Sequence, residues 1–107
     1  MSKNLIQMFP LGDILSLVTN RMVSLGNMES INKLRYFLAR DNNLSALQSA
    51  ILGDLFTIQI LKQHPQLEGV NASRVNNENL KEWLNEQIAK FGEELPIEQS
   101  PEGLIIF

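Results

Sequence analysis

Three residues, His64, Asp13 and Asp54, have side chains that could take part in acid–base or metal chemistry. His64 is the single histidine, and the chain contains no cysteine. Zinc sites need several His or Cys ligands, and a Ser-His-Asp triad needs a histidine beside a particular serine, so the sequence favours neither. Asp13 and Asp54 each follow a glycine and could pair as a carboxylate dyad. The competing interpretation is structural: His64 lies at a helix C-terminus, and the two aspartates are exposed helix-end charges.

A phosphate-binding loop needs closely spaced glycines before a helix, whereas the six glycines of this chain are scattered. We therefore expect no catalytic residues, no cofactor and no metal site, and we interpret the chain as a binding protein and not as an enzyme. An enzyme that acts on a small ligand, with His64, Asp13 or Asp54 at its site, is kept as a third hypothesis.

A short basic segment is the feature that would suit DNA. Lys33, Arg35, Tyr36 and Arg40 fall within one expected helix, and a short connector separates that helix from the one before it. Two helices joined in this way resemble a helix-turn-helix, whose second helix contacts bases and phosphates. The basic residues are few and Glu29 lies among them, so a solvated helix face is the competing interpretation.

Acidic side chains gather in the second half of the chain. The net charge is −3, but residues 1–63 hold six basic and four acidic side chains, whereas residues 64–107 hold three basic and eight acidic. Three of these glutamates repeat at a spacing of four, which places them on one helix face. The predicted contact residues for a basic partner protein are Glu78, Glu82, Glu86, Glu93 and Glu94.

The elements that must position these residues belong to one helical domain, residues 1–107. The composition, 44% hydrophobic and 20% charged, is that of an ordinary globular domain. Helical spacing and capping residues predict helices over about 10–19, 27–40, 45–63 and 77–92. The predicted fold class is mainly α: a compact bundle of about four helices with a short β-prone C-terminal tail or hairpin.

Each of the last three helices has an apolar face that we expect to be buried. In the second helix this face is Met28, Ile31, Leu34 and Leu38. In the third it is Ala46, Leu47, Ala50, Ile51, Leu55, Ile58 and Leu61, widened by Leu52, Phe56 and Ile60. In the fourth it is Leu80, Trp83, Leu84, Ile88 and Phe91. The breadth of the third face predicts a central helix, and Gly53 is the point where that helix could break.

The tail, residues 93–107, changes character and is β-prone. Residues 94–98 and 104–107 could form a hairpin around turn-forming residues, or the apolar end could dock on the helices. Other apolar side chains exceed what four helices need, and they either complete the core or form a dimer or partner interface. These are Met8, Phe9, Met22, Val23 and Leu25.

Three segments resemble a family of small proteins encoded by bacteriophages and prophages and having no assigned function. They are Phe9–Ser16 with the following residues 19–24, then Leu61–Leu67, then Leu80–Leu95. The sequence departs from the family pattern at Asn20, where a glycine is usual, and over Asn43–Ala50, which lacks the usual aromatic-Thr-His-Gln-Leu-Pro run. The resemblance implies expression in a bacterial cytoplasm, where small phage proteins often block host machinery.

The first hypothesis is therefore a phage accessory protein that binds, and inhibits, a host protein such as a restriction or CRISPR nuclease. A DNA-binding accessory or regulatory protein is the alternative, with nucleic acid as its partner, and the small-ligand enzyme is the second alternative. The longest apolar runs fall far short of the roughly 18 residues that span a membrane, so no membrane partner is expected. A homodimer fits the surplus of apolar residues.

Overall fold

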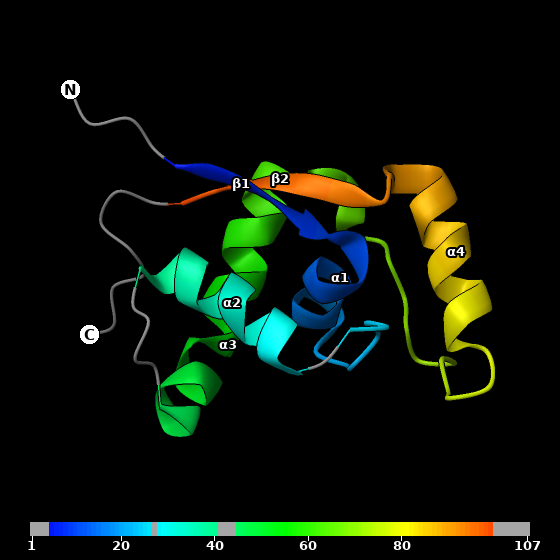
Figure 1. The fold of residues 1–107 in the computed structure, drawn as a ribbon, viewed down its shortest axis with the longest axis horizontal. Helices are drawn as coiled ribbons and strands as arrows, with labels where there is room; N and C mark the ends of the chain where they lie inside the picture. The colour runs from blue at the N-terminus through cyan, green and yellow to red at the C-terminus, as the bar shows by residue number, and fades with distance from the viewer. Residues whose placement is uncertain (1–4, 27, 41–44, 100–107) are drawn as a thin grey trace.

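The computed structural model describes residues 5–26, 28–40 and 45–99, and within them it contains four α-helices and a two-stranded antiparallel sheet (Figure 1). The elements in chain order are β1 Ile6–Pro10, α1 Leu11–Thr19, α2 Met28–Ala39, α3 Ala46–Gln63, a 3-10 turn Pro65–Leu67, α4 Leu80–Phe91 and β2 Glu94–Glu98. The mainly α fold with four helices is confirmed. None of the described helices is long and apolar enough to cross a membrane.

The sheet joins the two ends of the described chain. β2 pairs antiparallel with β1, with Gln7 opposite Ile97 and Phe9 opposite Leu95. The strand at 94–98 was predicted, and among the described residues its partner is the N-terminal segment 6–10, which was not expected to form a strand. The predicted arm at 104–107 lies outside the described residues. Pairing between distant segments leaves no turn signal in the sequence, and this is why β1 was missed.

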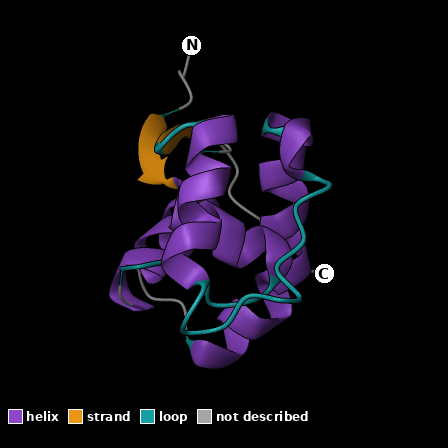
Figure 2. Ribbon diagram, turned by 90° about the vertical axis from the view of Figure 1, so that its right-hand side faces the viewer, coloured by secondary structure: helices purple, strands orange, loops and turns teal. Residues whose placement is uncertain are grey.

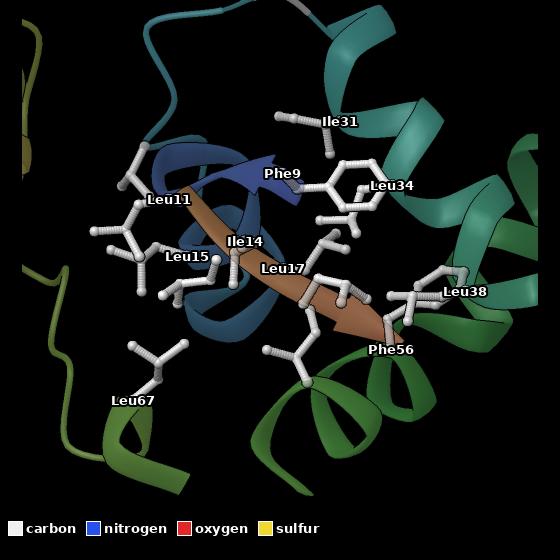
Figure 3. Close-up of a cluster of buried hydrophobic side chains, with 14 of the residues drawn as sticks. Phe9, Leu11, Ile14, Leu15, Leu17, Ile31, Leu34, Leu38, Phe56 and Leu67 are labelled. Atoms are coloured by element: carbon white, nitrogen blue, oxygen red, sulfur yellow. The ribbon is translucent and has the colours of Figure 1, made fainter. Parts of the chain in front are cut away.

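The core forms around α1. Leu11, Ile14 and Leu15 have no exposed surface, and α1 contacts β1 and the other three helices. Figure 3 shows that side chains from β1, α2, α3 and the 3-10 turn converge on this helix. The prediction that the third helix is the central one is therefore wrong. Pro10 precedes the first turn of α1, and Asn20 ends the helix in a left-handed conformation (φ 56°).

Helix α2 buries most of its predicted stripe. Ile31, Leu34 and Leu38 are buried, but Met28 is 51% exposed and does not join the core as expected. The half-buried Phe37 contacts Phe9 of β1 with ring centroids 5.3 Å apart, which ties α2 to the sheet.

Helix α3 buries only part of the broad apolar face that was predicted. Its first turn is held by a capping box between Ser45 and Gln48, and the helix continues through Gly53 without a break. The buried residues are Leu52, Phe56 and Ile60. The exposed apolar residues, which were expected to be buried, are Leu47, Ala50, Ile51 and Ile58. Because α3 is apolar on two sides, helical spacing alone could not tell which side faces the core.

The segment between α3 and α4 is anchored to the body of the molecule. The Arg21 guanidinium donates to the carbonyls of Ser73 (3.2 Å) and Val75 (3.0 Å), and Leu67, Ala72 and Val75 are buried. Arg21 therefore helps to hold in place a stretch that has little regular structure.

Helix α4 begins at Leu80, three residues after the predicted start. The Asn76 side chain accepts the main-chain N–H groups of Glu78 (2.9 Å) and Asn79 (3.0 Å), so an Asn-stabilised turn occupies the predicted first turn. Of the predicted apolar stripe only Leu84 is buried, and the other members are half-buried. The helix ends at Gly92, whose φ of +105° favours glycine.

Candidate interaction surfaces

Asp13 lies inside the protein and not at its surface as predicted. Its side chain is 1% exposed, and both carboxylate oxygens accept hydrogen bonds from hydroxyl groups. Ser24 of the connector donates to Oδ1 at 2.5 Å, and Ser30 of α2 donates to Oδ2. The main-chain N–H of Gly26 in turn donates to the Ser24 hydroxyl at 3.0 Å. The carboxylate therefore joins α1, the connector and α2, which is a structural role.

Asp54 and His64 lie in other environments. Asp54 is exposed on α3 whereas Asp13 is buried, so these two residues do not form the carboxylate dyad that was one of the alternatives. His64 ends α3, as the structural interpretation predicted, and its Nε2 donates to the carbonyl of Pro96 in β2 at 2.6 Å. Among the described residues, no group of three or more His, Asp or Glu side chains could hold a metal ion. The structure does not bring the three candidate catalytic residues together.

The basic residues of α2, with Arg40 just after its last residue, line two neighbouring clefts. Arg35 and Tyr36 line a cleft of about 610 Å³ between α2 and α3, with Asn32 beside them and Phe56 among its apolar residues. Lys33, Tyr36 and Arg40 line a cleft of about 380 Å³ on the side of β1, where Gln7 and Gln99 face them. Tyr36 belongs to both clefts. The four predicted DNA-contact residues therefore form one continuous surface.

This surface does not have the geometry of a typical helix-turn-helix. The connector between α1 and α2, residues 20–27, is eight residues long. The turn of a typical helix-turn-helix has three or four residues. Arg35 is also held along its own helix, since it donates to the Asn32 side-chain oxygen at 2.8 Å. The arrangement can attract an anion, but it does not present α2 in the usual manner of a recognition helix.

The acidic residues divide between α4 and its ends. Glu78, Glu82 and Glu86 line one shallow hollow of about 570 Å³ on the outer side of α4, as their spacing predicted. Glu93 and Glu94 are exposed beyond the end of the helix, in the turn and first residue that lead into β2. Lys81 lies in the same hollow, so the surface is not uniformly negative.

Exposed apolar side chains are the feature that sequence reasoning placed incorrectly. On α3, Leu47 is 70%, Ile51 is 55% and Ile58 is 47% exposed. The surplus residues elsewhere divide: Phe9 and Val23 complete the core, whereas the exposed ones are Met8, Met22 and Leu25. The α3 sequence carries this signal as a second apolar stripe, which helical spacing alone does not separate from the buried one.

Comparison of the chain with protein-family models, curated proteins and solved structures finds no match.

Proposed function

We propose that this chain is a protein-binding domain that contacts an amphipathic helix of its partner along the outer side of α3. The observation that carries the proposal is the exposed stripe Leu47, Ile51 and Ile58 on a continuous helix of 18 residues. Exposed apolar side chains gathered on one element mark interaction surfaces in soluble proteins.

The spacing of the stripe suits a helical partner. Leu47, Ile51, Asp54 and Ile58 are all exposed and follow one another at intervals of four, three and four residues. This is the repeat along which two helices pack in coiled coils and helix-in-groove complexes. Asp54 lies in the middle of this stripe. A partner helix with Lys or Arg facing Asp54 is therefore favoured over a partner helix that is apolar throughout.

The stripe is large enough to contribute to binding. Burial of a Leu or Ile side chain from full exposure stabilises by about 1.5–3 kcal/mol, and these three side chains are 70%, 55% and 47% exposed, so together they supply roughly 3–5 kcal/mol. The resemblance to phage-encoded proteins favours a host protein as the partner. Inhibition of that protein, for example a restriction or CRISPR nuclease, is the consequence that we propose.

The acidic surface of α4 is a separate candidate contact. Figure 1 places α4 and the N-terminal part of α3 at opposite ends of the molecule, so a small partner would not cover both. Charged surfaces mainly accelerate encounter, whereas buried apolar side chains slow dissociation. We therefore assign the contact to α3 and assign steering of basic partners to α4.

Affinity capture from a bacterial host lysate, followed by cross-linking mass spectrometry, tests the assignment. We expect Ile51→Glu to abolish recovery of a partner that the wild type retains, with cross-links from α3 to a helical segment of that partner. Glu82→Gln with Glu86→Gln tests the steering role separately: it leaves α3 intact, so it should slow capture of the partner but still retain it. Equal recovery by Ile51→Glu, or loss only in the α4 variant, would refute the α3 contact.

Nucleic-acid binding through α2 is the second candidate function. It is favoured by the continuous surface that Lys33, Arg35, Tyr36 and Arg40 form around two clefts. If it is correct, affinity for DNA falls as the salt concentration rises. Replacing Lys33 with Gln should then reduce the slope of log affinity against log salt concentration by about one, the equivalent of one released counterion. Absence of a DNA complex at low ionic strength rejects this candidate.

A further inference from the structure

The two outer edges of the sheet differ in their hydrogen bonding. The outer edge of β2 is covered by the end of α3. The Gln63 side chain donates to the Glu98 carbonyl at 2.9 Å and accepts the Glu98 N–H at 2.7 Å, and His64 donates to the Pro96 carbonyl at 2.6 Å. Pro96 has no N–H to satisfy, as is usual for proline on an edge strand. No further strand can therefore be added beside β2 without displacing these side chains.

Among the described residues, none covers the outer edge of β1 in this way. The Leu5 carbonyl accepts the N–H of Gln99 at 2.7 Å, and the Leu11 N–H donates to the Glu93 carbonyl at 2.9 Å. In an antiparallel ladder, residues alternate between bonding to the neighbouring strand and pointing away from it. The main-chain N–H and C=O groups of Ile6 and Met8 therefore point outward. Within the described residues, no hydrogen bond engages the N–H or C=O of either residue. Figure 2 shows the sheet at the margin of the molecule.

The side chains on this strand add to the exposed apolar surface. Ile6 is 65% and Met8 is 50% exposed, and both point to the face opposite the buried Phe9. Proteins usually protect an edge strand with a charge, a bulge or a covering element. Residues 6–9 of β1 are uncharged and no bulge interrupts the register with β2; only Pro10, which has no N–H, protects the end of the strand.

We propose that β1 pairs antiparallel with β1 of a second copy, which would form a four-stranded sheet in the order β2, β1, β1, β2. An isologous two-fold contact requires each copy to offer the same self-complementary patch. With Gln7 opposite Gln7 of the second copy, Ile6 lies opposite Met8 in both halves. The two outward-facing N–H groups and two C=O groups of each copy then form four hydrogen bonds.

The same register places apolar side chains together. Ile6 of one copy and Met8 of the other become directly opposed neighbours on the outer face, and Pro96 flanks Met8 through the existing ladder. Two five-residue strands bury less than the roughly 1,200 Å² of a standard stable interface. The dimer is therefore expected to dissociate on dilution, and α3 and α4 remain free for other partners.

Sedimentation velocity over a wide range of protein concentration tests the proposal, together with hydrogen exchange of the Ile6 and Met8 amides. We expect a shift from monomer to dimer as concentration rises, with slowed exchange of both amides only in the dimer. Met8→Pro removes an outward N–H that β2 does not use, and it should abolish the dimer. Met8→Ala, which keeps the N–H, should retain a weakened dimer and serves as the matched control.

Three results would overturn the proposal. They are a monomer at every concentration, a dimer that persists in Met8→Pro, and amides of Ile6 and Met8 that are already protected in the monomer. A dimer lost in Ile51→Glu but kept in Met8→Pro would assign self-association to α3 instead. If circular dichroism shows that Met8→Pro disturbs the fold, Ile6→Lys replaces it as the test variant. It places a charge on the same strand and should likewise abolish the dimer.

Discussion

Replacement of Asp13 by alanine should destabilise the fold more than any other change to a charged residue of α1 or α3. Ser24 and Ser30 each donate a hydroxyl to this buried carboxylate, and a hydrogen bond to a charged group contributes about 1.5–3 kcal/mol. Ser30 is only half-buried and can be rehydrated, so we take the lower value for each bond. The substitution should therefore lower the free energy of unfolding by about 3 kcal/mol.

Urea unfolding monitored by circular dichroism measures this loss, with Asp54→Ala as the control. Asp54 is exposed on α3, and removal of its carboxylate should change the free energy of unfolding by no more than about 0.5 kcal/mol. A double-mutant cycle with Ser24→Ala separates the hydrogen bond from the loss of volume, because the two single effects should not add. If the free energy of unfolding of Asp13→Ala lies within about 1 kcal/mol of the wild-type value, the carboxylate does not join the helices as described.

Three further predictions concern the helices. Gly12→Ala should lower the free energy of unfolding by about 1–3 kcal/mol although alanine is the better helix former, because its Cβ would lie 3.0 Å from the Cα of Ser24. Gly53→Ala should raise it by up to about 1 kcal/mol, since the added Cβ meets nothing within 4 Å beyond its chain neighbours and the backbone of its own helix. Ser45→Ala should cost about 1 kcal/mol by removing the capping box with Gln48. Thermal unfolding measures all three, and equal signs for the two glycine variants would contradict the packing of α1.

The helices could be predicted from the sequence because their determinants are local. Pro10 before α1, Ser45 before α3 and Gly92 after α4 act on neighbouring residues through fixed backbone angles or capping hydrogen bonds. The grouping of Glu78, Glu82 and Glu86 on one surface likewise followed from helical spacing. The late start of α4 was missed because Asn79, like Asn77, could cap a helix, and spacing alone does not choose between them.

Tertiary structure decided the features on which the proposed function depends. Asp13 could not be told from an exposed helix-end charge until Ser24 and Ser30 were brought to it from outside α1. Helix α3 has two apolar sides, and packing against α1 buried the side with Phe56 and left the side with Ile51 exposed. β1 formed a strand because β2 returned beside it from the far end of the described chain. These outcomes depend on contacts between residues far apart in the chain, which local spacing does not specify. The sequence by itself therefore determined the helices and the charges they display, whereas the fold determined which apolar surface remains available to a partner.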